Sequence, residues 1–97
     1  MNHTPDTRPA VLPVRTGGVR EAADRAAGQP VRGEVRLDFA AVEVVASREL
    51  GPLVVLNRKV KEAGGRLALV NVGPLVADVL AVTSLDTILD VRRAGGQ

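Results

Sequence analysis

The sequence contains no cysteine, a single histidine (His3) and a single aromatic residue (Phe39). Without cysteine there is no disulfide, no thiolate metal ligand and no thiol nucleophile, and one histidine excludes a multi-histidine zinc site within one chain. No stretch approaches the roughly 20 consecutive apolar residues of a membrane span, and residues 1–9 lack the apolar core of a secretory signal. We therefore expect a cytoplasmic protein that does not insert into a membrane and has no metal or other cofactor.

Positive charge is not concentrated in any part of the chain. The sequence has 13 Lys and Arg residues and 11 Asp and Glu residues, a net charge of +2. From Leu37 to Gln97, seven basic residues balance seven acidic ones. Nucleic-acid binding needs clustered cations and usually stacking aromatic rings, so we expect no nucleic-acid partner.

A chain of 97 residues is long enough for one domain, and the core of this domain is expected in its later part. Large apolar residues (Val, Ile, Leu, Met, Phe) number 6 in residues 1–34 and 25 in residues 35–97. We predict a loose tail over residues 1–9, a single domain over residues 10–92 and a C-terminal tail over residues 93–97. Removal of residues 1–9 should leave the stability unchanged.

The first half of the domain is predicted to contain two strands and one small helix. Residues 10–14 are expected to form a short edge strand, and the Ala-rich residues 19–27 a helix that Gly28 ends. Residues 35–39 alternate between apolar and polar side chains, which predicts a second strand. Ala40–Ala41 is expected to be the connection that follows this strand.

From Ser47 the apolar residues recur at the three- and four-residue spacing of a helix, which Gly64–Gly65 ends. The buried side of this helix is predicted to consist of Leu50, Leu53, Val54, Leu56, Val60 and Ala63, and the solvated side of Arg58, Lys59, Lys61 and Glu62. Pro52 lies so near the start that the regular helix should be disturbed between Ser47 and Leu50.

The last third of the chain continues the alternation of strand and helix. Residues 66–72 are almost continuously apolar, as in an interior parallel strand covered on both faces. Pro74 opens a helix that Thr83–Ser84 ends, and residues 85–91 should form a short strand or a turn of helix. The buried side of this helix is predicted to consist of Leu75, Val76, Val79, Leu80 and Val82. Together these elements predict an open α/β sheet with right-handed crossovers.

The sequence offers no catalytic constellation, and we predict that the protein is not an enzyme. Its glycines do not have the spacing of a dinucleotide or phosphate loop. Ser47 lies at a strand-to-helix turn, where a nucleophile elbow would lie, but the flanking glycines are missing and the lone His3 lies in the tail. The simpler interpretation is that Ser47 is a helix N-cap and that Glu49 lies favourably at the positive end of the helix.

Three other polar residues have structural interpretations. Asp38 and Glu43 flank a predicted turn and are interpreted as turn and surface residues rather than as paired catalytic carboxylates. Asn71 is expected to satisfy the turn into Gly73–Pro74.

Residues 35–42 resemble the hydrophobic-hydrophobic-Asp-hydrophobic-small-small-Val signature of STAS domains, the modules of anti-sigma factor antagonists and sulfate transporters. Residues 50–72 resemble the helix, the Lys-x-Ala-Gly-Gly turn and the central strand of this family, and residues 79–86 resemble its next helix with the Leu-Asp exit. The resemblance covers about residues 35–92 and implies a small STAS-like open sheet with parallel strands and packed helices.

The family usually has two strands and a longer helix before the Asp-bearing strand. The short front of this chain therefore implies a missing N-terminal strand, or an edge left for another chain to cover.

Members of this family bind protein partners, often anti-sigma factors with kinase activity, and a serine in an Asp-Ser-Ser-Gly loop is their switch. The corresponding residues here are Ala46-Ser47-Arg48-Glu49, so Ser47 is kept and Arg48 replaces the usual phosphoacceptor. The resemblance implies a non-catalytic, anti-sigma factor antagonist-like module of bacterial signal transduction and transcription regulation. Its partner is expected to contact Ala46, Ser47, Arg48, Glu49 and Pro52. Control by phosphorylation of Ser47 is not expected, because the usual acceptor is missing.

Other functions stay open at this point. STAS domains also occur as soluble subunits or ligand-binding domains associated with transporters, and a decayed domain without a present role is a third possibility. Self-association through an exposed sheet edge also stays open.

Overall fold

The computed structural model describes residues 10–28 and 33–95, which form one four-stranded sheet and three α-helices. The strands are β1 (Ala10–Arg15), β2 (Glu34–Ala41), β3 (Arg66–Val72) and β4 (Asp90–Arg93). They lie in chain order and every neighbouring pair is parallel, because the chain returns through α1 (Val19–Ala27), α2 (Leu50–Glu62) and α3 (Pro74–Val82). The predicted α/β fold with an open parallel sheet is confirmed. The predicted tail over residues 1–9 lies outside the described residues.

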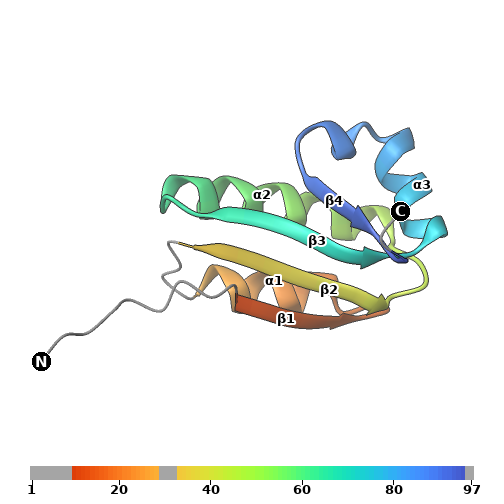
Figure 1. Ribbon diagram of the computed structural model, residues 1–97, viewed down its shortest axis with the longest axis horizontal. Coiled ribbons are helices and arrows are strands. Elements are labelled where there is room, and N and C mark those ends of the chain that lie inside the picture. The colour runs from red at the N-terminus through yellow and green to blue at the C-terminus, as the bar shows by residue number, and fades with distance from the viewer. Residues whose placement is uncertain (1–9, 29–32, 96–97) are drawn as a thin grey trace, which may run out of the picture.

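The sheet and the helices make two layers with one core between them. Figure 1 shows α1 and α2 behind the sheet and α3 next to β4. One continuous hydrophobic cluster joins buried side chains of all three helices with those of β1, β2 and β3. Alternation explains the contribution of β2, in which Val35, Leu37 and Phe39 point into the cluster and are 1%, 0% and 1% exposed. The strand extends further than predicted, because Ala41 pairs with Arg15 of β1 instead of starting a connection.

The front of the domain agrees with the sequence prediction. β1 is an edge strand of the described sheet, and α1 covers the predicted helix residues with Gly28 as its C-cap. Val19, Ala22, Ala23 and Ala26 form the buried side of α1. Small alanines let the backbone of α1 lie close to the sheet, so a short helix still contributes to the core.

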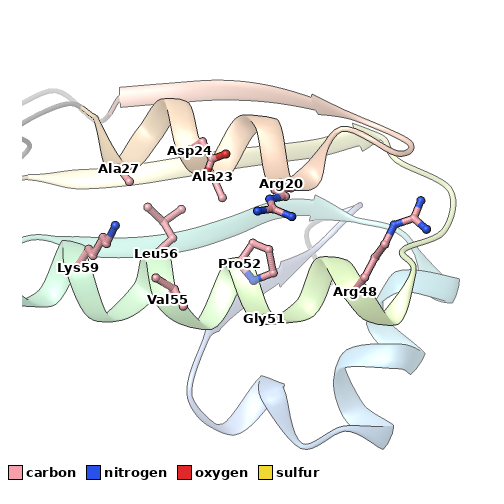
Figure 2. Close-up of a pocket in the computed structure, with 10 residues that line it drawn as sticks. All are labelled: Arg20, Ala23, Asp24, Ala27, Arg48, Gly51, Pro52, Val55, Leu56 and Lys59. Carbon is pink, nitrogen blue, oxygen red and sulfur yellow. The ribbon is translucent and has the colours of Figure 1, made fainter.

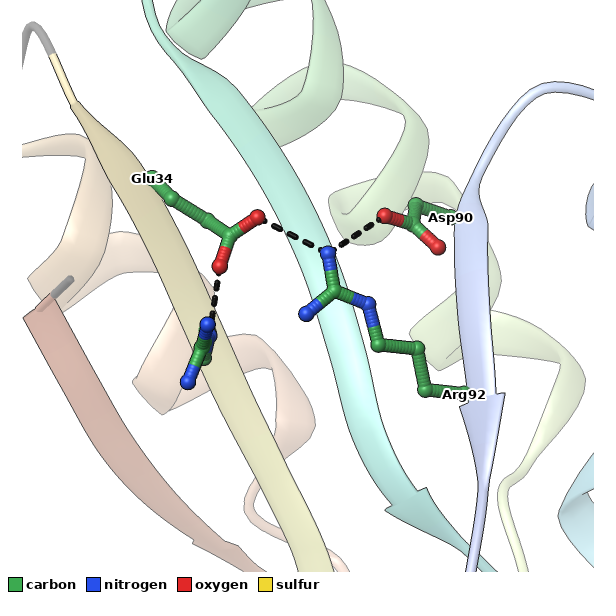
Figure 3. A network of polar contacts seen from close by, with 4 residues as sticks. Glu34, Asp90 and Arg92 are labelled. Carbon is green, nitrogen blue, oxygen red and sulfur yellow. Dashed lines mark hydrogen bonds and ion pairs between the residues drawn. The ribbon is translucent and has the colours of Figure 1, made fainter. Parts of the chain in front are cut away.

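The face of the sheet away from the hydrophobic core is covered by polar side chains of the strands. Ala68 of β3 is 0% exposed, yet it does not belong to the hydrophobic cluster. It pairs in register with Arg36 on β2 and Asp90 on β4, so these three side chains share the face away from the core. Arg92 reaches across β3, with its guanidinium 2.8 Å from a Glu34 carboxylate oxygen and 2.9 Å from an Asp90 oxygen (Figure 3). Ala68, on the second face of β3, is thus covered by ion-paired side chains, and among the described elements no helix contributes to that cover, which corrects the interpretation of this strand.

The start of α2 is irregular, as Pro52 predicted. A short 3₁₀ helix over Ser47–Glu49 precedes α2, which becomes regular only at Leu50. Pro52 then lies in the first turn of α2, where its missing N–H leaves no hydrogen bond unmade. Leu53, Leu56 and Val60 are buried as predicted, whereas Ala63 is the C-cap and is exposed.

The buried side of α3 is narrower than its apolar sequence suggested. Only Val76 and Leu80 of this helix are buried. Leu75 is 57% exposed and Val82 85% exposed, so the prediction that both line the core was wrong. A helix at the end of a small sheet contacts the core through one narrow stripe, and the remaining apolar residues face solvent.

Candidate functional site

The loop between β2 and α2 leaves the sheet at the carboxyl end of β2 and carries all the predicted partner-binding residues except Pro52, which lies in the first turn of α2. Thr16, in the turn after β1, holds this loop in place. Its hydroxyl accepts a hydrogen bond from the Glu43 amide at 3.0 Å and donates one to the Ala41 carbonyl at 3.3 Å. The loop is therefore tied to the neighbouring β1–α1 turn before α2 begins.

Glu49 ties the same loop to α1. Its side chain is 6% exposed. One carboxylate oxygen accepts the Ala46 amide at 2.8 Å, and the other accepts the amide of Val19, the first residue of α1, at 3.2 Å. Both amides lie at helix starts, where free N–H groups and the helix dipole favour a negative charge. A single carboxylate thus caps two helix starts that are far apart in the sequence.

The prediction that Ser47 caps the helix was wrong. The N-cap of the 3₁₀ turn is Ala46, and in the described part of the chain the Ser47 hydroxyl makes no capping hydrogen bond. Glu49 takes this role from the third position of the turn, the place that Glu occupies in a capping box. The structure therefore leaves the Ser47 hydroxyl free of a capping function.

Most of the predicted partner-binding residues lie at the surface. Ala46, Ser47 and Arg48 are exposed and Pro52 is partly buried, whereas Glu49 is buried below them. The contact with a partner stays a prediction for the first four. For Glu49 the geometry indicates a supporting position beneath that surface rather than direct contact.

This surface continues into a groove between α1 and α2 with a volume of about 370 Å³. Figure 2 shows Arg48 at one end, Lys59 near the other, and the guanidinium of Arg20 between the two helices close to Pro52. The lining residues are Arg20, Ala23, Asp24 and Ala27 of α1 together with Arg48, Gly51, Pro52, Val55, Leu56 and Lys59 of the 3₁₀ turn and α2. We call the small and apolar lining residues the floor of the groove and the charged lining residues its rim; the rim consists of three basic side chains and one acidic one, Arg20, Arg48, Lys59 and Asp24.

Asp38 and Asn71 form a separate polar contact near the carboxyl ends of β2 and β3. The Asn71 side-chain amide donates to Asp38 Oδ1 at 3.0 Å, and the Ala40 amide donates to the same oxygen at 2.9 Å. The Asn71 hydrogen bond, and then that of Ala40, hold the pKa of Asp38 below its usual value. Asp38 is therefore a structural carboxylate, and Asn71 bridges two strands instead of serving the turn into Gly73–Pro74.

The described residues contain no group of three or more His, Cys, Asp or Glu side chains that could hold a metal ion. Within the same ranges, none of the helices has the length and apolar character needed to cross a membrane.

Sequence reasoning missed two features of this region. It placed Glu49 at the helix start but could not show that the carboxylate also meets α1. It also treated Lys59 as part of a solvated helix face and gave no role to Arg20, although the two line one groove. A sequence signal existed only for Glu49, as the third residue of a capping box that lacks its Ser or Thr.

The sequence pattern of the family described as "Mlab, STAS domain" matches residues 15–90 of this chain. The chain therefore belongs to the STAS domain family, as its resemblance implied. No curated protein matches the chain in sequence.

Solved structures show the same fold. An anti-sigma-factor antagonist (STAS) domain protein from Planctomyces limnophilus has a TM-score of 0.67 and 25% identity, over 95% of this chain and 86% of that one. The crystal structure of TM1081 from Thermotoga maritima, described as a proposed anti-sigma factor antagonist, has a TM-score of 0.69 and 22% identity, over 87% of this chain and 78% of that one. An NMR structure of TM1081 has a TM-score of 0.68 and 21% identity, over 97% and 84% of the two chains.

Proposed function

We propose that this STAS domain is a non-catalytic protein-interaction module that acts as an anti-sigma factor antagonist without control by serine phosphorylation. The proposal rests on the exposed start of α2. Ala46, Ser47 and Arg48 lie there at the surface, and the buried carboxylate of Glu49 fixes their loop through hydrogen bonds to two backbone amides. A surface held by hydrogen bonds on both sides loses little conformational freedom on binding, which favours recognition of a protein partner. This role implies a cytoplasmic location.

Arg48 carries the part of the proposal that concerns phosphorylation. It occupies the position of the usual acceptor and has no hydroxyl. Ser47 beside it is exposed, but Glu49 lies two residues away with its carboxylate committed to Ala46 and Val19. A phosphate on Ser47 would add negative charge near this carboxylate, while Arg48 and the helix start would attract it. These two electrostatic effects on a phosphorylated Ser47 oppose each other. The absence of a hydroxyl at the usual acceptor position, Arg48, is therefore the main argument against a phosphorylation switch.

Affinity capture from a lysate of the source cells tests the partner. The bait is the full chain, and Ala46→Glu and Arg48→Glu are compared with Arg58→Glu, which reverses a charge on an exposed part of α2. We expect a protein with a histidine-kinase-like ATPase domain in the wild-type and Arg58→Glu eluates and its loss from the other two. Recovery of a permease and its ATPase instead would assign the domain to a transporter.

Mass spectrometry of the cellular protein tests the absence of a phosphorylation switch. We expect Ser47 to be unmodified. A stoichiometric phosphate on Ser47 that abolishes capture of the partner would overturn this part of the proposal and leave the interaction itself intact.

A further inference from the structure

We propose that the groove between α1 and α2 binds an acidic amphipathic helix of a partner protein. This inference rests on the proposed function, because Arg48 and Pro52 belong both to the groove and to the proposed partner surface. Beyond the proposed function, it extends the binding surface to the α1 side of the groove and predicts that the binding segment is helical and acidic.

The charges of the lining residues indicate an acidic partner. Three basic side chains, Arg20, Arg48 and Lys59, line the groove against one acidic side chain, Asp24. Within the described part of the chain, none of the four takes part in an ion pair, whereas Arg25 on another side of α1 pairs with Glu21. Rim charges of one sign steer and select partners of the opposite sign.

The floor of the groove indicates an apolar contact. The exposed Ala27 of α1 and Gly51 of α2 are small, so a guest can approach the backbones of both helices, and Val55 is 45% exposed. Covering this exposed valine stabilises a complex, since burial of apolar surface is favourable. The binding segment should therefore present apolar side chains to the floor and carboxylates to the rim.

The shape of the groove favours a helix over an extended strand. Both sides of the groove are helices, whose backbone N–H and C=O groups are paired beyond the first turn, so most of the groove offers no hydrogen-bond partners to an extended backbone. A helix satisfies its own backbone and can lie along a straight trough between two others. The lining residues from Arg20 to Ala27 and from Arg48 to Lys59 span about two and three helical turns, which limits the contact to a short segment.

An unbiased selection tests the proposal. A displayed library of random peptides of about 16 residues, roughly 24 Å long as helices, is selected on the immobilised full chain. We expect the enriched peptides to combine Asp and Glu with apolar residues at three- and four-residue spacing, and to become helical on binding by circular dichroism. Enrichment of basic or uncharged peptides, or no enrichment, would overturn the proposal.

Charge reversal then locates the binding site. The double variant Arg20→Glu/Lys59→Glu should weaken binding of the selected peptide about tenfold or more at low salt, as expected for the loss of complementary rim charges. The matched control Arg58→Glu/Lys61→Glu reverses two exposed charges of α2 outside the groove and should leave the affinity unchanged. If both double variants weakened peptide binding equally, the effect would come from the net charge of the protein and not from the groove, and the proposal would be overturned.

The remaining outcomes separate this proposal from the proposed function. If Ala46→Glu abolishes capture of the partner while Arg20→Glu/Lys59→Glu does not, the groove proposal fails and the interaction module stands. If the free chain is a dimer that Arg20→Glu/Lys59→Glu dissociates, a second copy occupies the groove and the acidic-helix proposal is overturned. We expect a monomer by light scattering.

Discussion

The Glu49 carboxylate accepts a hydrogen bond from the backbone amide of Val19 at 3.2 Å, across 30 residues of sequence. The same carboxylate accepts the Ala46 amide, three residues before it. One buried side chain thus joins the start of α1 to the start of the 3₁₀ turn and α2. The two helices that form the groove are therefore held together at one end by a polar contact as well as by the core.

Replacement of Glu49 should be costly. Glu49→Ala leaves the amides of Val19 and Ala46 without their acceptor, which should lower the free energy of unfolding by about 2–4 kcal/mol. Glu49→Gln keeps one acceptor oxygen and should cost less. Urea denaturation of both variants measures this, with the exposed Glu43→Ala as the control. Equal midpoints for Glu49→Ala and Glu43→Ala would show that the bridge does not contribute to stability.

The Ser47 hydroxyl should contribute little to stability. Because it makes no capping hydrogen bond in the described part of the chain, Ser47→Ala should change the free energy of unfolding by less than about 0.5 kcal/mol. A true N-cap would lose about 1 kcal/mol on the same substitution. Thermal or urea unfolding distinguishes the two values, and a loss of the larger size would restore Ser47 as the cap.

A leucine-to-alanine substitution should lower the free energy of unfolding much more in the core than on the exposed side of α3. Leu69 is 0% exposed in the centre of β3, and Leu75 is 57% exposed on α3. Leu69→Ala should lower the free energy of unfolding by about 2–5 kcal/mol, because it leaves a cavity in the core. Leu75→Ala should stay within about 0.5 kcal/mol of the wild type. Similar melting temperatures for the two variants would contradict the placement of the core.

Stability should fall at acidic pH, in part through Glu34. Its hydrogen bond with Arg36, and then that with Arg92, hold the pKa of Glu34 below its usual value near 4.5. A carboxylate whose pKa is lower in the folded state stabilises the fold above the unfolded-state pKa, and this contribution is lost as the pH falls through the folded-state pKa. Unfolding free energies should therefore decline as the pH falls below about 4.5, with Asp38 contributing in the same direction.

The variant Glu34→Gln isolates the contribution of Glu34 to the pH dependence of stability. The variant should be less stable than the wild type at neutral pH and should lose less stability between about pH 5 and pH 3, because one linked proton is removed. Glu62→Gln, at an exposed position outside the ion pairs of the described residues, is the control and should keep the wild-type slope. An unchanged slope in Glu34→Gln would contradict the assignment.

Elements with strong local sequence signals could be predicted before the structure was known. The alternation of Val35, Leu37 and Phe39 was enough to predict β2, and the spacing of Leu53, Leu56 and Val60 was enough to predict the buried side of α2. Pro52 predicted the irregular helix start, because its effect acts within one turn. The resemblance to STAS domains also depended on short runs of neighbouring residues, and the family assignment confirmed it.

Contacts between residues far apart in the sequence could not be predicted, because they depend on how the helices and strands pack. Glu49 could not be recognised as a double cap, because its second partner, Val19, lies in another helix. The cover over Ala68 depends on Arg92 reaching from β4 to Glu34 on β2. The groove depends on Arg20 of α1 and Lys59 of α2 lining the same hollow between the two helices. Likewise, Leu75 and Leu80 have the same chemistry, but only Leu80 faces the core. Local patterns specify which segments become strands and helices, whereas contacts between distant residues depend on how those segments pack together.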